Sequence, residues 1–171
     1  MEPVMEAIQN VPAFENAGNQ ITDLLERHLA SAIDLQFRIS HAIWNAEDPR
    51  LAETRELGTT ASEINQFCEL IATRLRALGA AGLTSLRRTR ARSFLDPHPL
   101  AATGDEEHIS TIGLALTKLQ NSARQARDKA AILRDQTTAA LFGKLARMID
   151  AQIWFLGSPS RASWKLQPKV P

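Results

Sequence analysis

Histidine and carboxylate side chains are the groups in this chain with the most distinctive chemistry, because imidazole nitrogen and carboxylate oxygen together suit a metal such as iron. The candidates are His28, His41 and Glu69. His28 lies in an apolar helical stripe, which favours a hydrogen-bonded core or interface histidine over a metal ligand. A metal site that uses His28, His41 or Glu69 is the alternative interpretation.

Other signatures of catalysis are missing from the sequence. It has no glycine-rich phosphate loop, no Cys/His zinc spacing and no Ser-His-Asp pattern. Cys68 is the single cysteine, so an intramolecular disulfide is excluded. Because Cys68 also lies in an apolar stripe, the sequence predicts a buried small hydrophobe and not a nucleophile.

Composition narrows the function classes further. The 171 residues suffice for one domain with a real core. The net charge of +1 gives no global basic field that would favour nucleic acid. Residues 1–10 lack the basic and apolar regions of a signal peptide, and no stretch is long and apolar enough to span a membrane. With the single cysteine, these features predict a cytoplasmic protein without a membrane partner.

Four apolar stripes with helical spacing predict an all-α fold. Tyrosine is absent and Ala, Leu and Arg dominate, which also favours helix. Four helices of roughly 20–28 residues would form a four-helix bundle. The stripes are Ile21, Leu25, His28, Ala32, Leu35, Ile39 and Ala42; Leu57, Ala61, Ile64, Cys68, Ile71, Leu75 and Leu78; Ile109, Ile112, Leu116, Leu119, Ala123, Ala126, Ala130 and Leu133; and Leu141, Phe142, Leu145, Met148, Ile149, Ile153, Phe155 and Leu156.

Turn-forming residues separate the stripes. Pro49 ends the first helix because proline disfavours helix at the residue before it. Gly79 ends the second helix. A tight turn at residues 134–137 joins the last two helices, with Asp135 or Thr137 as the cap.

A long connection, residues 80–103, joins the second and third stripes. A ferritin-like four-helix bundle needs such a crossover to carry the chain from one end of the bundle to the other. Residues 83–92 predict a short helix within it, and Thr103 with Glu106 resembles a capping box that opens the next helix. We therefore expect a flexible N-terminal tail at 1–18, a ferritin-like bundle at 19–157 and a flexible basic C-terminal tail at 158–171.

The segment 33–45 reads I-D-L-Q-F-R-I-S-H-A-I-W-N and resembles the end of the first helix of Dps-type mini-ferritins, near I-D-L-Y-L-Q-T-K-Q-A-H-W-N. The residues in register are Asp34, Leu35, Ala42, Trp44 and Asn45. Further segments resemble Dps motifs in the same order, at 71–79, 92–108 and 135–156. The resemblance covers about residues 21–156 and implies a ferritin-like cage subunit, although fold similarity does not settle function.

In Dps proteins, iron is oxidised at a site that two subunits share, with two histidines, an Asp and a Glu as ligands. The resemblance places these ligands at Ile43, at Thr54 or Arg55, at Glu69 and at Thr73. Glu69 is then the sole surviving metal ligand, which implies a vestigial ferroxidase site with no catalytic residue. The family's iron-entry pores are acidic, whereas the matching stretch here, 140–144, is apolar apart from a lysine and would not attract Fe(II).

Dps-type proteins often bind DNA through basic tails. The N-terminal tail here has no Lys or Arg, but the C-terminal tail carries Arg161, Lys165, Lys169 and the aromatic Trp164. Twelve such tails on a cage would add by multivalency, and the binding would be non-specific and salt-dependent. A solvated tail without a ligand is the other interpretation.

The densest basic cluster lies in the crossover, at Arg87, Arg88, Arg90 and Arg92. These arginines could contact phosphate. We favour pairing with acids across a subunit interface, or plain exposure to solvent.

The favoured interpretation is a Dps-like homo-oligomeric cage, most simply a dodecamer, with a vestigial ferroxidase site and a DNA-protective or structural role in oxidative stress. One alternative is an active mini-ferritin that oxidises and stores iron through altered ligands or with a partner subunit. A ferritin-like bundle with an unrelated role is the third hypothesis.

Overall fold

The computed structural model describes residues 2–46, 52–82, 85–98 and 104–157, with side chains described for the same residues except 2–15, 52–54 and 157. Its helices are α1 (Glu2–Trp44), α2 (Ala52–Ala77), α3 (Leu86–Arg92), α4 (Asp105–Ile132) and α5 (Gln136–Gly157). The described ranges contain no strand, so the all-α prediction is confirmed.

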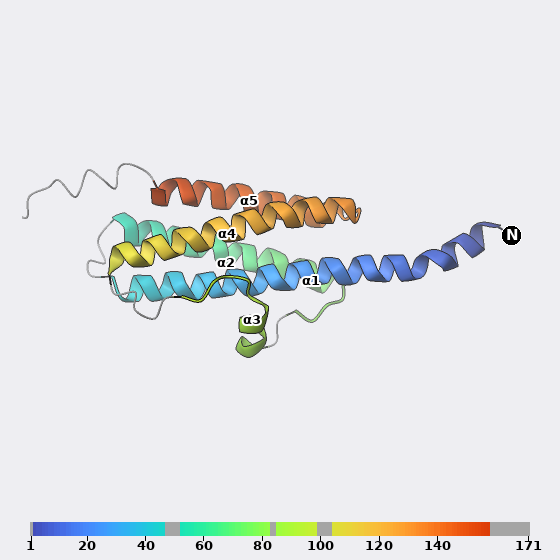
Figure 1. Cartoon of the computed structure of the whole chain (residues 1–171), viewed down its shortest axis with the longest axis horizontal. Coiled ribbons are helices and arrows are strands. Elements are labelled where there is room, and N and C mark those ends of the chain that lie inside the picture. Colours follow the sequence, from blue (N-terminus) through green and yellow to red (C-terminus); the bar gives the residue numbers. More distant parts are fainter. Residues whose placement is uncertain (1, 47–51, 83–84, 99–103, 158–171) are drawn as a thin grey trace, which may run out of the picture.

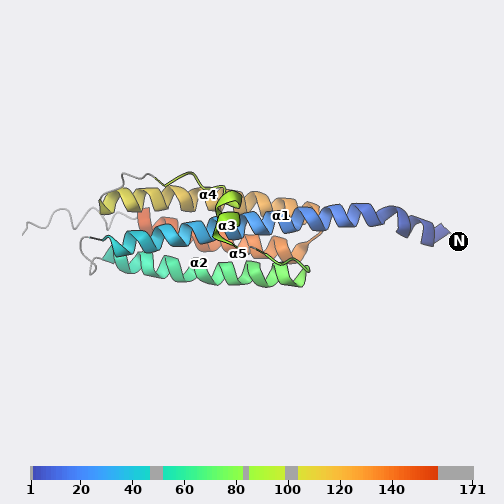
Figure 2. The same cartoon turned by 90° about the horizontal axis from the view of Figure 1, so that it is seen from below.

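The long helices α1, α2, α4 and α5 lie side by side as an elongated four-helix bundle (Figure 1). Helix α1 packs on α2 and α4, and α5 packs on α4 and α2. The short helix α3 lies outside the bundle against α1 (Figures 1 and 2). This is the ferritin-like arrangement that the crossover length predicts.

The predicted stripes form the core. The side chains of Leu25, Ile71, Leu116 and Leu145, one from each long helix, are at most 1% exposed. Burial of such side chains is the main favourable contribution to folding. Two stripe residues do not join the core: Leu78 is 37% exposed and Phe155 is 47% exposed, because each lies in or just beyond the last turns of its helix.

Two helices end in the hydrogen-bond pattern known as the Schellman motif. After α2, Gly79 has a φ of 77°, and the amide of Ala80 donates to the carbonyl of Leu75 at 3.0 Å. After α4, Arg134 has a φ of 61° and the amide of Asp135 donates to the carbonyl of Ala130 at 2.9 Å. Both predicted breaks are therefore confirmed.

The start of α4 differs from the prediction. Its N-cap is Gly104, one residue after the Thr103 of the predicted capping box. Thr103 itself lies outside the described residues. Three acidic residues occupy the first turn, where the positive end of the helix dipole favours them.

The N-terminal part of α1 lies in the stretch expected to be a tail. The helix begins at Glu2, so it extends through the stretch 2–18 that the sequence predicts as a tail, and this part runs past the end of the bundle (Figure 1). Within the described ranges, no helix has the combined length and apolar character needed to cross a bilayer.

Candidate metal centre

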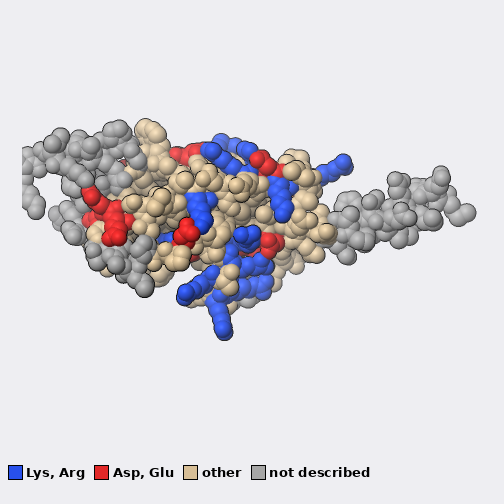
Figure 3. Space-filling view, in the orientation of Figure 1, with Lys and Arg blue, Asp and Glu red and all other residues tan. Residues whose placement is uncertain are grey.

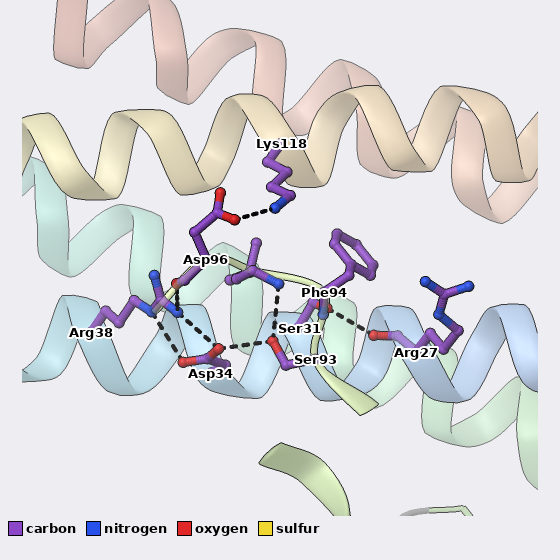
Figure 4. Close-up of polar contacts among 9 residues, drawn as sticks. Arg27, Ser31, Asp34, Arg38, Ser93, Phe94, Asp96 and Lys118 are labelled. Carbon is purple, nitrogen blue, oxygen red and sulfur yellow. Dashed lines mark hydrogen bonds and ion pairs between the residues drawn. The ribbon is translucent and has the colours of Figure 1, made fainter. Parts of the chain in front are cut away.

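A network of polar contacts fixes the crossover segment after α3 against α1 (Figure 4). Arg38 donates two hydrogen bonds of 3.0 Å to the carboxylate of Asp34, one turn earlier on α1. The same guanidinium donates to the backbone carbonyl of Asp96 at 2.6 Å, and the Ser93 hydroxyl donates to Asp34 at 2.8 Å. The Arg38 side chain is only 7% exposed, so its charge is neutralised by Asp34 inside the protein.

The segment is also attached at two further points (Figure 4). The amide of Phe94 donates to the Ser31 hydroxyl of α1 at 3.1 Å, and Lys118 of α4 donates to the Asp96 carboxylate at 2.7 Å. The pKa of Asp96 is lowered by this hydrogen bond from Lys118. The stretch from Ser93 to Asp96 is thus held on both α1 and α4, two residues before His98.

His98 lies in a cluster with two other histidines. His41 comes from the last turn of α1, and His108 comes from the first turns of α4. One ring nitrogen from each histidine lies within 4.8 Å of the other two. The ring centroids are 5.4 to 6.0 Å apart, and the rings of His98 and His108 are nearly parallel, at 7°.

Most of the ring nitrogens in this cluster are buried without a hydrogen-bond partner among the described residues. They are Nδ1 of His41, both nitrogens of His98 and Nδ1 of His108. Desolvation lowers the pKa of His98, and the nearby Arg38, His108 and His41 lower it further. A neutral imidazole has a free lone pair, which is the form that binds a metal.

His28 is separate from this cluster. Its Nδ1 lies 2.7 Å from the Leu24 carbonyl and its Nε2 lies 3.0 Å from the Ser122 hydroxyl. The ring is 2% exposed and contacts Phe142 edge-on at 4.6 Å. Burial lowers the pKa of His28 to about 4. The prediction of a hydrogen-bonded core histidine is confirmed.

The positions that the Dps resemblance assigns to iron ligands show a different environment. Ile43 is half-buried and packs against the apolar core at the end of α1. Glu69 and Thr73 lie one turn apart on α2 and are exposed, and the Glu69 carboxylate accepts a hydrogen bond of 3.2 Å from Asn65. Arg55 is exposed, and the side chain of Thr54 lies outside the described residues. Glu69 belongs to no metal-binding cluster within the described part of one chain.

The stretch aligned with the iron-entry pore lies on α5. Phe142 is fully buried and packs on His28, so it belongs to the core. Lys144 is exposed. The charged side chain that the stretch 140–144 exposes to solvent is therefore that of a lysine, and not that of an acidic residue.

The candidate DNA-binding residues cannot be placed, because Arg161, Trp164, Lys165 and Lys169 lie outside the described residues. Lys and Arg side chains instead gather over the protruding α3 (Figure 3). Arg88 and Arg92 pair with Glu26 of α1 at 3.3 and 2.7 Å. These partners belong to the same chain, and not to a neighbouring subunit, because α3 packs on α1.

Sequence reasoning missed two members of the histidine cluster. It considered His41 for a relocated metal site but grouped it with His28 and Glu69, which lie elsewhere. The available signal was that His98 and His108 stand on either side of the crossover's second half, close to its junction with α4.

Comparison with known proteins agrees with the fold. No family model matches the chain. The chain is 29% identical over 142 residues to the DNA protection during starvation protein of Agrobacterium fabrum. The match covers 82% of this chain and 88% of that protein. It is similar in structure to Dps from Thermosynechococcus elongatus, with a TM-score of 0.78, 16% identity and coverage of 92% of this chain and 97% of that one. It is also similar in structure to Dps from Vibrio cholerae O1, which is described as ferritin-like. The TM-score is 0.76 at 15% identity, and the match covers 88% of this chain and 91% of that one.

The four long helices and their crossover define a ferritin-like four-helix bundle. In sequence the chain is similar to the relative from Agrobacterium, and in fold it is similar to the Dps structures.

Proposed function

We propose that this Dps-like chain is a subunit of a closed cytoplasmic homo-oligomer, a dodecamer, that does not oxidise Fe(II). The observation that carries the proposal is the packing of Ile43 against the apolar core, where the resemblance places a ligating histidine. A hydrocarbon side chain offers no lone pair to a metal, and its packing gives this position a structural role instead.

The remaining positions support the loss of iron oxidation. Thr73 carries no charge, and exposed Arg55 would repel a cation. Glu69 alone offers a carboxylate, and a single carboxylate in water binds a hard divalent cation weakly. An active ferroxidase at these aligned positions would need further ligands from another chain, because Glu69 offers the one carboxylate among them.

Exposed apolar side chains support assembly. Large exposed patches of this kind mark interfaces, and closed symmetry is the usual way in which identical chains bury them. Trp44 is 72% exposed beside Phe37, and Trp154 is 68% exposed beside Phe155, at the ends of α1 and α5. The exposed apolar residues of the described chain are Phe37, Trp44, Leu70, Leu78, Leu86, Leu114, Ile132, Trp154 and Phe155.

Protection of DNA is the role that the Agrobacterium relative's name suggests for the assembled shell. The C-terminal tail supplies Arg161, Lys165, Lys169 and Trp164 for contacts with phosphates and bases. Repetition of the tail on each subunit would make weak contacts effective. Deletion of residues 158–171 should then abolish a gel shift of duplex DNA, and an unchanged shift would contradict the role of the tail.

Iron oxidation provides the decisive test. Stopped-flow absorbance should show that the purified protein oxidises Fe(II) no faster than buffer, under air or with peroxide. The double variant Ile43→His/Thr73→Glu restores two of the missing ligands and should bind Fe(II) more tightly than the unmodified protein. Rapid, saturable oxidation by the unmodified protein would contradict the proposal. Sedimentation of a monomer at micromolar concentration would contradict the assembly.

A further inference from the structure

Three of the chain's four histidines converge at one point of the fold. They come from three separate segments: His41 from the end of α1, His98 from the crossover and His108 from the start of α4. Histidine is a scarce residue in this sequence, and the ring nitrogens of these three approach one another to within 4.8 Å. Such convergence places three imidazole nitrogen donors around one volume.

The nitrogens of this cluster have little else to bind. Nδ1 of His41, Nδ1 of His108 and both nitrogens of His98 are buried and make no hydrogen bond with a described residue. A buried polar atom without a partner costs roughly 1–3 kcal/mol, which is why such atoms in folded proteins usually have a hydrogen-bond partner, and a bound metal ion would satisfy these nitrogens instead. The contrast with His28, whose two nitrogens both have partners, shows that this fold can satisfy a buried histidine when no ligand is needed.

We propose that His41, His98 and His108 bind one divalent transition-metal ion, Zn²⁺ in preference to Mg²⁺ or Ca²⁺, within a single chain. Imidazole suits zinc, whereas magnesium and calcium require oxygen ligands. Three protein ligands and one open position form a common tetrahedral zinc geometry. With Zn–N bonds of about 2.0–2.1 Å, the three nitrogens would lie roughly 3.4 Å apart, so small side-chain rotations close the site around the ion.

The surrounding contacts prepare this site. The segment that carries His98 is fixed to α1 by Arg38 and Asp34 and to α4 by Lys118. Arg38 brings a positive charge near the cluster, but its two hydrogen bonds to Asp34 neutralise it. Rigid support of this kind holds metal ligands in place and lowers the ordering cost of binding.

The proposed site is distinct from the positions that the family resemblance assigns to iron oxidation. His41 and Ile43 are two residues apart on α1, so their side chains point about 200° apart around the helix. The histidine site needs no second chain, whereas the family's ferroxidase ligands come from two subunits. Its consequence would be structural: the ion would join the crossover to both helices that flank it.

Metal titration of the full-length protein tests the proposal. After dialysis against a chelator and then buffer, Co²⁺ should bind with one ion per chain and give the visible absorption of a tetrahedral nitrogen site, and Zn²⁺ should displace it. His98→Ala should weaken Zn²⁺ affinity by more than about 10-fold, since even a ligand's supporting partner contributes that much. His98 lies in the crossover and is only half-buried, so this variant should still fold.

Matched variants distinguish this site from other histidines and from the aligned iron position. His28→Gln removes the fourth histidine, and Glu69→Gln removes the candidate iron ligand. Both should bind Zn²⁺ as the unmodified protein does. Absence of Zn²⁺ binding by the unmodified protein, or unchanged binding by His98→Ala, would overturn the histidine site alone. Binding that survives in His98→Ala but is lost in Glu69→Gln would place the metal at Glu69 and contradict the inactive-site proposal as well.

Thermal unfolding gives a second readout. Saturating Zn²⁺ should raise the melting temperature of the unmodified protein by about 5 °C or more, because the ion binds only the folded chain. Mg²⁺ at the same concentration should have no such effect, and a chelator should reverse it. An equal Zn²⁺-dependent shift in His98→Ala would overturn the proposal.

Discussion

Arg74 of α2 and Asp135, the residue before α5, form a two-point ion pair in which one guanidinium nitrogen donates to both carboxylate oxygens, at 3.0 and 2.8 Å. The same carboxylate accepts the backbone amide of Thr138 at 2.9 Å and thereby caps α5. Desolvation acts to raise the pKa of Asp135, but the hydrogen bonds from Thr138 and Arg74 outweigh it and lower the pKa. One side chain therefore begins a helix and also attaches it to α2.

Replacement of Asp135 should therefore remove two interactions at once. Asp135→Ala should lower the free energy of unfolding by about 2 kcal/mol, from the lost cap and from the partly buried Arg74 left without its partner. Asp135→Asn should lose less, because asparagine still caps a helix. Chemical denaturation followed by circular dichroism measures both variants. Asp128→Ala is the control, since its pair with Arg127 is exposed and should contribute under about 0.5 kcal/mol.

Asp34 should be needed to hold the crossover in place. Asp34→Ala leaves the charge of Arg38, only 7% exposed, without a counter-ion, and should lower the free energy of unfolding by about 3 kcal/mol. Asp96→Ala removes only the exposed pair with Lys118 and should lower the free energy of unfolding much less than Asp34→Ala does. Limited proteolysis should cut the crossover faster in Asp34→Ala than in Asp96→Ala. Equal cutting of the two variants would show that the Arg38 network does not restrain this segment.

His28 should make the protein less stable in acid. The pKa of His28 is about 4 in the folded chain, and in the unfolded chain it has the ordinary value of 6.5. Between these two pH values the unfolded chain therefore binds the proton and the folded chain does not. Stability is therefore full above about pH 6.5 and falls as the pH drops toward 4, by at most about 3 kcal/mol.

The variant His28→Gln isolates this contribution. An uncharged amide cannot take up a proton in this range, so the loss of stability between pH 6.5 and pH 4 should be smaller than in the unmodified protein. Denaturant midpoints at a series of pH values measure the difference. Parallel pH profiles for the two proteins would show that His28 is not the group that titrates.

Cys68 should be inert in the folded protein. The thiol is buried on α2, and burial raises its pKa to about 11, so at pH 8 the reactive thiolate is scarce. A thiol reagent such as Ellman's reagent should react about 100-fold or more slowly with the native protein than with the urea-unfolded chain. Similar rates in the two states would mean that the helix opens readily around this residue.

The helices and their order could be read from the sequence because they depend on local information. Apolar residues three and four apart, such as Ile64, Cys68 and Ile71, define a helix face wherever the chain folds. Gly79 and Asp135 mark helix boundaries through their own backbone and side-chain preferences. The long interval between α2 and α4 then required a crossover. The replacement of expected iron ligands by Ile43 and Thr73 was also a property of the sequence alone.

The tertiary structure decided which distant side chains meet. His41 and His98 lie 57 residues apart in the sequence, and no periodic pattern connects them. Only the path of the crossover over α1 and α4 brings them together with His108. The same packing pairs Arg92 with Glu26 in one chain, where the sequence had favoured acids across a subunit interface or plain exposure to solvent. Contacts between segments far apart depend on how the elements dock, and local spacing carries no information about that.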